Sequence, residues 1–383
     1  MKNFDVIIVG AGSIGVPTAL SLSKRKLKVL VIEKYPSIGQ GQNKSAIGGI
    51  RATHSDGAKI KIGLKSLEIF SAWQQTYGDD INWQKGGYLF PIYTADDKKL
   101  MTDLLEKQKS YGLNINWIGT GEVKEIVKGI NGEHLLGGIY SPDDGNASPL
   151  LAMNAFYRQA KKLGVEFNFN ETVTEIKTQN GKVTQVKTDK GRYNCNYIIN
   201  CAGAYAREVG QMAGVDLPVK PDMHEGAITE PVEKLFAPMV VDIRQSEDAK
   251  NYYFYQNKEG QIVFCMTPQP SLYGTDRNAT SAFLPSISKK MIGILPKLSV
   301  VKVRRSWRGL YPMTSDGFPI VDTFENAKGF ISAVGMCGQG FMLAPGIGEL
   351  VSKMITGSLS SEDKEILRSF SATRKFTDTE VYK

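Results

Sequence analysis

The sequence predicts an α+β protein with two domains: a discontinuous α/β domain that binds a dinucleotide, and a second domain built on an antiparallel sheet. The chain has 383 residues, 42% of them hydrophobic, which is enough for two cores. Its N-terminus shows a strand, a glycine-rich turn, a helix and a second strand in succession. Hairpin signals and a tyrosine-rich strand follow later, where a purely doubly wound fold would continue with further α/β repeats.

Composition excludes several classes of protein. No stretch reaches the roughly 18 uncharged apolar residues of a membrane-spanning helix. The apolar run 4–22 contains Asp5 and a glycine-punctuated turn, so we interpret it as structure and not as a signal peptide. The four cysteines lack C-x-x-C spacing, and His54 and His134 have no partner at metal-ligand spacing. We therefore expect no metal site, reduced thiols and a cytoplasmic location.

The formal net charge is +8, and seven basic residues with no acidic one lie within 289–308. We interpret this cluster as a solvated basic face; a docking site for an acidic partner and steering of an anionic substrate are the alternatives. Nucleic acid is not predicted as a partner.

The first forty residues predict a nucleotide site. The run Val6 to Val9 is typical of a central parallel strand, and it leads into Gly10-Ala-Gly-Ser-Ile-Gly15 and a helix. A second strand, 28–32, ends at Glu33. Gly10 permits the tight turn, Gly12 lets a pyrophosphate approach the backbone and Gly15 lets helix and strand pack closely. The N–H groups at the helix start would meet the phosphate charge, and Glu33 would accept hydrogen bonds from the adenosine ribose.

Later segments indicate that the nucleotide domain is discontinuous. A second glycine-rich stretch, 39–50, suits a ligand lying across it. A helix is predicted from Pro149, capped by Ser148, to about residue 163. The signals after it are a strand at 165–169, hairpin turns at Asn180-Gly181 and Asp189-Lys190-Gly191, a strand at 197–200 and the turn Cys201-Ala202-Gly203. We expect residues 1–55, 146–215 and 311–383 to form the nucleotide domain, and 56–145 and 216–310 the substrate domain.

Four ordered motifs resemble the D-amino-acid oxidase superfamily of FAD enzymes. They are Gly10-Ala-Gly-Ser-Ile-Gly15 with Glu33, Asn200-Cys-Ala-Gly-Ala-Tyr205, the segment Arg305 to Asp316, and the segment Gly338 to Gly346. Within that superfamily, Ser45-Ala-Ile-Gly-Gly-Ile-Arg51 and His224-Glu-Gly-Ala-Ile-Thr-Glu-Pro231 are similar to the group of sarcosine oxidase β-subunits and dye-linked L-proline dehydrogenase β-subunits.

The resemblance implies an extended FAD with its flavin ring between 45–50 and 338–342 and the Val173 backbone near the adenine. Relatives that attach the flavin covalently have a cysteine in place of Gly309 or a histidine in place of Pro149, so noncovalent FAD is implied. The alternative for 338–340 is a simple loop before a helix that starts near Pro345. The predicted cofactor-binding residues are Gly10, Gly12, Ser13, Ile14, Gly15, Glu33, Lys34, Asn43, Lys44, Ser45, Ala46, Gly48, Gly49, Ile50, Val173, Cys201, Ala202, Gly203, Gly338, Gln339, Gly340, Phe341 and Met342.

The resemblance also implies hydride transfer from the carbon of a C–N bond to flavin N5, which leaves an imine. Arg51 would bind the substrate carboxylate bidentately, unless it is a salt-bridged structural arginine. Tyr311 stands where glycine oxidases have an arginine, and Met342 where monomeric sarcosine oxidases have a lysine, so the substrate stays open. Further candidate catalytic residues are Tyr253 and Tyr255, which alternate onto one face of a strand and otherwise belong to the core, His224, which touches substrate, tunes its protonation or is structural, and Gln339.

The predicted function is FAD-dependent oxidation of a small amino acid or N-methyl amino acid that is sarcosine-, proline- or glycine-like. The strand 261–266 lacks the lysine with which monomeric oxidases activate oxygen, which favours a dehydrogenase that passes electrons to a second subunit or carrier. The alternatives are a peroxide-producing oxidase and a non-catalytic FAD-binding electron-transfer subunit. A pyridine-nucleotide reductase is disfavoured, because no second G-x-G-x-x-G follows a strand.

Overall fold

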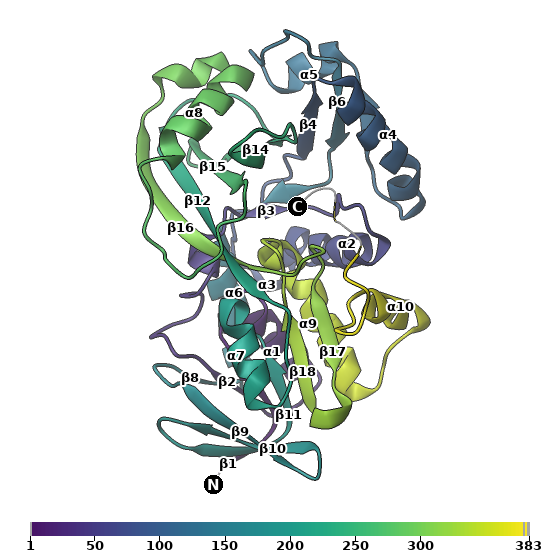
Figure 1. Ribbon diagram of the computed structural model, residues 1–383, viewed down its shortest axis with the longest axis vertical. Helices are drawn as coiled ribbons and strands as arrows, with labels where there is room; N and C mark the ends of the chain where they lie inside the picture. The colour runs from purple at the N-terminus through teal and green to yellow at the C-terminus, as the bar shows by residue number, and fades with distance from the viewer. Residues whose placement is uncertain (1, 378–379, 381–383) are drawn as a thin grey trace.

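The computed structural model describes residues 2–377 and residue 380 (Figure 1). Two eight-stranded sheets dominate it. In the view of Figure 1, the sheet that contains β1 lies in the lower half and the sheet that contains β12 and β16 in the upper half. The chain passes between the halves several times. The two sheets, together with the helices around them, confirm the α+β class.

The lower sheet brings together strands from three distant parts of the chain. Its central strands are parallel, with β1 between β2 and β11, and β11 next to β18. Val6, Ile7 and Ile8 of β1 are fully buried, as expected for a central strand of a sheet that is covered on both faces. Both expected hairpin turns connect the antiparallel strands β9, β10 and β11. In spatial order the main strands are β17 (Ile320–Thr323), β18 (Phe330–Val334), β11 (Arg192–Asn200), β1 (Lys2–Val9), β2 (Val29–Ile32) and β8 (Glu166–Asn168), with β10 (Lys182–Thr188) and β9 (Val173–Gln179) attached through β11.

Helices from several segments of the chain accompany this sheet in the lower half of the molecule (Figure 1). The cap of α6 (Pro149–Lys162) is as expected, because the Ser148 hydroxyl accepts a hydrogen bond from Leu151 N–H. Other helices here are α1 (Gly15–Lys24), α3 (Trp73–Tyr77), α7 (Ala206–Met212) and α10 (Ser361–Ser369).

Two expectations about the helices need correction. Helix α9 (Gly340–Thr356) begins five residues before the expected start, so Pro345 lies inside it. The glycines that looked like a loop allow the helix to begin at the cavity wall. Helix α2 (Gly57–Ser71) falls in the segment assigned to the substrate domain, yet it packs on α9, where a Cβ on Gly346 would lie 2.7 Å from the Ile62 carbonyl oxygen. We therefore propose that the domain boundary lies after α3.

The upper sheet separates a core from a cavity. All neighbouring strands are antiparallel except β13 and β4. Tyr252, Phe254 and Phe264 pack on α8 (Phe283–Ile294) on one face, while Tyr253 and Tyr255 project from the other. The strand order is β16 (Val303–Met313), β12 (Lys220–Pro231), β15 (Gln261–Pro268), β14 (Ala249–Gln256), β13 (Met239–Asp242), β4 (Tyr88–Ile92), β6 (Gly137–Ser141) and β5 (Asn116–Ile118).

The remaining elements complete the upper half and its junction with the lower half. Helices α4 (Ala95–Ser110) and α5 (Thr120–Ile126) accompany β4 and β6. The short strands β3 (Gly49–Ile50) and β7 (Gly145–Asn146) pair with each other at the junction. They join the glycine-rich stretch to the end of the first substrate-domain segment.

Candidate active site

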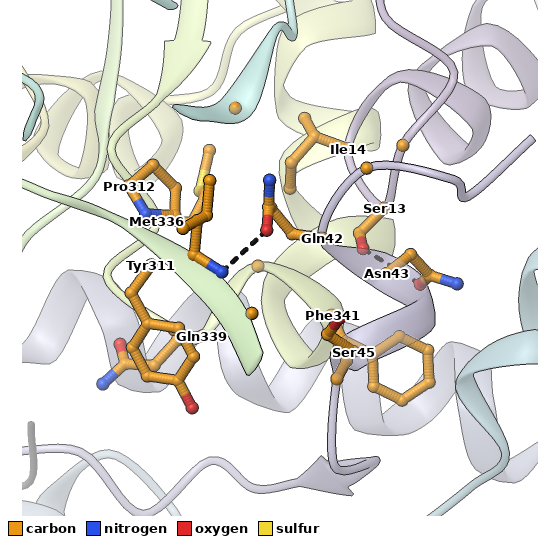
Figure 2. Close-up of a pocket in the computed structure, with 18 of the residues that line it drawn as sticks. Ser13, Ile14, Gln42, Asn43, Ser45, Tyr311, Pro312, Met336, Gln339 and Phe341 are labelled. Atoms are coloured by element: carbon orange, nitrogen blue, oxygen red, sulfur yellow. Dashed lines mark hydrogen bonds between the residues drawn. The ribbon is translucent and has the colours of Figure 1, made fainter. Parts of the chain in front are cut away.

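A cavity of about 410 Å³ runs along the junction of the two halves. Its wall combines the ends of β1, β2 and β11, the stretch 41–49, the beginning of α9, and side chains of the upper sheet. Figure 2 shows part of this wall, with Ser13, Gln42 and Gln339 among the labelled side chains. The volume is typical of a site for a small molecule or cofactor.

The three glycines after β1 have different surroundings. A Cβ on Gly10, whose φ is +107°, would lie 2.6 Å from the Cys201 carbonyl oxygen. A Cβ on Gly15 would lie 1.9 Å from the Gly10 carbonyl oxygen. A Cβ on Gly12 meets nothing within 4 Å, although Gly12 lines the cavity. Two glycines therefore allow close packing, and Gly12 leaves open space beside the backbone as a pyrophosphate requires.

Glu33 fixes the backbone at the end of the cavity next to the glycine turn. Its carboxylate accepts hydrogen bonds from Ala11 N–H at 2.8 Å and from Tyr35 N–H at 2.9 Å. Lys34 Nζ lies 3.2 Å from the centroid of the Tyr205 ring. Ala11 does not line the cavity, whereas Glu33, Lys34, Tyr35 and Tyr205 do. The Glu33 carboxylate has remaining lone pairs that could accept from a ribose hydroxyl.

The glycine-rich stretch is fastened to the upper sheet by side-chain hydrogen bonds. Leu310 N–H donates to Gln42 Oε1 at 2.8 Å, and a dashed line at the labelled Gln42 in Figure 2 marks this bond. Trp307 Nε1 donates to the Ser45 carbonyl at 3.0 Å, and the Tyr255 hydroxyl donates to the Ile47 carbonyl at 2.7 Å. These hydrogen bonds satisfy polar groups of the stretch 41–49. They also hold this stretch against the upper sheet at the cavity wall.

The beginning of α9 closes the opposite wall. Residues 338–342 line the cavity, so they are not a simple loop away from it. A Cβ on Gly338 would lie 2.1 Å from the Tyr311 ring, which shows how closely this backbone approaches β16. Gln339 is 4% exposed, and its Oε1 has no hydrogen-bond partner among the described residues. This buried acceptor, together with the N–H groups at the helix start, suits the amide-like edge of a flavin. The residues present therefore fit FAD.

Two tyrosines and a histidine meet at the other end of the cavity. The Tyr253 and Tyr311 hydroxyls lie 2.8 Å apart, and the His224 ring stacks on the Tyr311 ring with centroids 3.8 Å apart. Burial raises the pKa of both tyrosines well above the usual value, so both phenols are neutral at physiological pH. They can donate or accept hydrogen bonds without adding charge.

Arg51 is 6% exposed and lines the same cavity. Its guanidinium donates to the Thr53 carbonyl and lies 3.3 Å from His54 Nδ1. Burial, followed by the charges of Arg51 and Lys59, holds the pKa of His54 well below its usual value, so His54 is neutral. The positive charge near this part of the cavity wall therefore comes from Arg51 and Lys59, and not from His54.

Two buried carboxylates balance these cations. Glu380 lies 2.9 Å from Lys59 Nζ, with both side chains fully buried. Asp144 accepts hydrogen bonds from Ala52 N–H and the Thr53 hydroxyl, and burial raises its pKa to about 6. The backbone after Arg51 is thus held firmly, and the guanidinium stays at the cavity wall.

Most predicted site residues converge on the cavity, and four do not line it. Lys44 is exposed and bonds Gln40, Gly15 and Ile50 lie behind the wall, and Tyr255 acts through the Ile47 carbonyl. Wall residues that sequence reasoning missed include Tyr35, Gly41, Gln42, Tyr88, Phe90, Tyr205, Met239, Val241, Ile243, Asn251, Cys265 and Thr267. Proximity to predicted motifs could have found Tyr35, Gly41, Gln42 and Tyr205; the others carry no local signal.

Other site classes find no support in the described part of the chain. No group of three His, Cys, Asp or Glu residues there could hold a metal ion. No described helix combines the length and hydropathy that crossing a membrane requires. Arg308 of the basic cluster is buried and paired with Glu225 and Asp276, so this residue is not part of a solvated face.

Known proteins similar to this chain support the assignment. Hydrogen cyanide synthase subunit HcnC of Pseudomonas protegens is 24% identical over 93% of each chain, and glycine oxidase of Geobacillus kaustophilus is 25% identical over 97% of each. The crystal structure of L-proline dehydrogenase from P. horikoshii superimposes with a TM-score of 0.91 at 28% identity, covering 97% of this chain and 98% of that one. A model of the family "FAD dependent oxidoreductase" (DAO) matches residues 5–354. The chain belongs to the DAO family of FAD-dependent oxidoreductases.

Proposed function

We propose that the protein oxidises the C–N bond of a small amino acid or N-methyl amino acid that is sarcosine-, proline- or glycine-like. The observation that carries the proposal is Arg51, a buried cation at the wall of a cavity that also fits FAD. A guanidinium with its planar fork is well suited to bind a carboxylate bidentately. The names of glycine oxidase and L-proline dehydrogenase, two similar proteins, point to the same class of substrate.

The side chains at this end can orient such a substrate and exclude water. Arg51 would hold the carboxylate, while the neutral Tyr253 and Tyr311 hydroxyls offer hydrogen bonds without a competing charge. Phe90 and Met239 contribute apolar wall, which suits a short aliphatic or cyclic side chain. Bound FAD would supply the two-electron acceptor, and a dry wall would prevent premature contact with water.

The electron acceptor separates two forms of this function. Strand β15 (Gln261–Pro268) has no lysine, which favours a dehydrogenase that passes electrons to a carrier or second subunit. A peroxide-producing oxidase is the second candidate, supported by the similarity to glycine oxidase.

Anaerobic mixing of the FAD-loaded protein with sarcosine, proline, glycine and D-alanine tests the proposal. Bleaching of the flavin absorbance by at least one of them is expected. Admission of air then distinguishes the two acceptors, because rapid reoxidation indicates an oxidase and slow reoxidation a dehydrogenase. A flavin that none of these amino acids bleaches would support a non-catalytic FAD-binding subunit instead.

A further inference from the structure

A carboxylate from the C-terminal segment lies behind the part of the cavity wall that carries Arg51. The Glu380 side chain is fully buried, and its Oε2 atom lies 2.9 Å from Lys59 Nζ. Its Oε1 atom accepts hydrogen bonds from the Ser55 N–H at 3.0 Å and from the Ser55 hydroxyl at 2.8 Å. Ser55 and Lys59 follow closely after Arg51 in the sequence. Glu380 therefore joins the C-terminal segment to the chain just beyond the arginine.

The connection between β3 and α2, which begins at Arg51, has no regular secondary structure. Side chains from distant parts of the chain bond its backbone instead. Gln108 Nε2 donates to the His54 carbonyl at 3.0 Å. Lys107 Nζ donates to the Ser55 carbonyl at 2.8 Å, and the Ser55 N–H is bonded by Glu380. Because no helix or sheet ladder holds this connection, its path depends on these side chains.

The C-terminal segment is itself anchored where it approaches Ser55. The Glu380 N–H donates to the Asp316 carbonyl at 3.2 Å. Arg374, six residues earlier, donates from Nε to the Asp316 carboxylate at 2.7 Å. The Glu380 carboxylate therefore reaches Ser55 and Lys59 from a fixed backbone position.

Buried charges couple Glu380 to Arg51. Burial disfavours ionisation of Glu380, but the positive charges around it, that of Lys59 above all, outweigh burial and hold its pKa well below the usual value. The charge of Arg51 contributes to this shift, so the two groups interact within the protein interior. Burial lowers the pKa of Lys59, and Glu380 opposes this effect. Removal of Glu380 alone would leave Lys59 as a buried cation without this carboxylate.

We propose that Glu380 is a positioning residue for Arg51, through which the C-terminal segment sets the affinity of the cavity for a carboxylate. Arg51 lines the cavity, whereas Glu380, Ser55 and Lys59 lie behind its wall. Glu380 thus acts on a ligand through the connection that it fixes, because a guanidinium binds a carboxylate bidentately only when its planar fork is correctly placed. The inference rests on the proposed function in assigning the substrate carboxylate to Arg51.

Binding of pyrrole-2-carboxylate to the FAD-loaded protein tests the inference without turnover. This anion has the shape of proline but no saturated C–N bond to oxidise, and its binding can be followed by the flavin absorbance. Pyrrole-2-carboxamide has the same shape without the charge. Glu380→Ala should raise the Kd of the carboxylate about 10-fold or more, because a misplaced guanidinium loses hydrogen bonds to a charged group. The Kd of the carboxamide and the FAD content should stay as in the wild type.

A double variant separates the position of Arg51 from the charge of Glu380. Lys59→Met combined with Glu380→Gln removes both charges of the buried pair, and the new amide oxygen can still accept from Ser55. The Kd of the carboxylate should return to within about 3-fold of the wild-type value, because the Ser55 hydrogen bonds are kept. A double variant that binds as weakly as Glu380→Ala would show that charge and not position matters, and would overturn the inference.

Asp242→Asn is the matched control. Asp242 is also a buried carboxylate that accepts a backbone N–H and pairs with a cation, but both belong to Arg244. This variant should leave both Kd values unchanged. Ser55→Ala removes the hydroxyl hydrogen bond to Glu380 and leaves the ion pair with Lys59 in place, so it decides the matter if Glu380→Ala does not fold. It should raise the Kd of the carboxylate about 3-fold, and an unchanged Kd would count against the inference.

The same measurements separate this inference from the proposed function. A wild type that binds the carboxylate more tightly than the carboxamide, but whose flavin no amino acid reduces, would remove the proposed function and leave the role of Glu380 measurable. Equal affinities of the wild type for the two ligands would remove Arg51 as the carboxylate site and overturn the inference. An unchanged Kd of the carboxylate in a folded Glu380→Ala variant would overturn it as well.

Discussion

The two ends of the cavity are built from different material. At the nucleotide end the wall is mostly backbone, with Gly10 and Gly12 beside the ligand space and Glu33 accepting a hydrogen bond from Ala11 N–H in the turn. At the substrate end the wall consists of side chains from separate strands, including His224 and Tyr253. A site formed by backbone atoms requires glycine at particular spacings. A site formed by side chains from several strands requires only that those strands pair in the right register.

This difference explains why the nucleotide end carries a compact glycine motif, whereas the substrate end draws its side chains from strands far apart in the sequence. Gly10, Gly12 and Gly15 are close in sequence and act within one turn. Tyr253 and Tyr311 are 58 residues apart, and their hydroxyls meet because β14, β15, β12 and β16 are neighbours in the sheet. Substitutions at the nucleotide end should therefore affect folding or FAD binding, and those at the substrate end should affect turnover.

The largest effect is expected for Gly15→Ala. Its Cβ would lie 1.9 Å from the Gly10 carbonyl oxygen, so backbone must move. We expect a loss of about 3 kcal/mol or more in the free energy of unfolding, measured by urea denaturation, together with loss of FAD. Gly12→Ala is the control, because its Cβ meets open space. It should unfold like the wild type without FAD but bind FAD more weakly; equally tight FAD binding would show that no phosphate approaches Gly12.

Arg51→Ala should raise the KM for the amino acid about 10- to 100-fold, the effect of losing hydrogen bonds to a charged group. The FAD content should be unchanged, as measured by the absorbance ratio of flavin to protein. Arg51→Lys should recover part of the loss, since it keeps the charge but not the planar fork. Loss of FAD with unchanged turnover per bound flavin would contradict the assignment and place Arg51 in the nucleotide half.

Glu33→Gln should weaken FAD binding about 10-fold with little effect on turnover at saturating FAD. The amide keeps one acceptor oxygen, so one of the Ala11 and Tyr35 N–H groups would face an NH₂ group. Titration of the FAD-free protein, followed by fluorescence quenching, measures the change. An unaltered Kd would indicate that the ribose does not use this carboxylate.

The smallest effect is expected for Tyr253→Phe. Loss of its hydrogen bond to Tyr311 should lower kcat/KM about 5-fold while FAD affinity is retained, the size of one neutral hydrogen bond. Tyr252→Phe is the matched control, because that hydroxyl donates to the Lys290 carbonyl on the opposite face of the sheet. If both substitutions changed kcat/KM equally, the position of Tyr253 on the cavity face of β14 would not explain its effect on turnover.

Sequence reasoning predicted the strand, turn, helix and strand of the N-terminal segment because their determinants are local. The run from Val6 to Glu33 contains strand, turn, helix and acceptor in one continuous segment, and the fold places them as the spacing predicts. The errors concern helices whose start or packing depends on contacts between residues far apart in the sequence. The start of α9 was missed because Pro345 usually marks a first turn. The packing of α2 on α9, on which the proposed boundary rests, was not foreseen because α9 lies almost 300 residues later.

The sequence alone determined the cofactor class and the α+β architecture, because glycine spacing and hydrophobic periodicity are properties of neighbouring residues. Only the tertiary structure decided which side chains line the cavity. Tyr88, Met239 and Cys265 reach the cavity through the order of strands in one sheet, and the same sheet places the His224 ring against Tyr311. Strand pairing joins residues far apart in the chain, and no local pattern specifies which strands become neighbours.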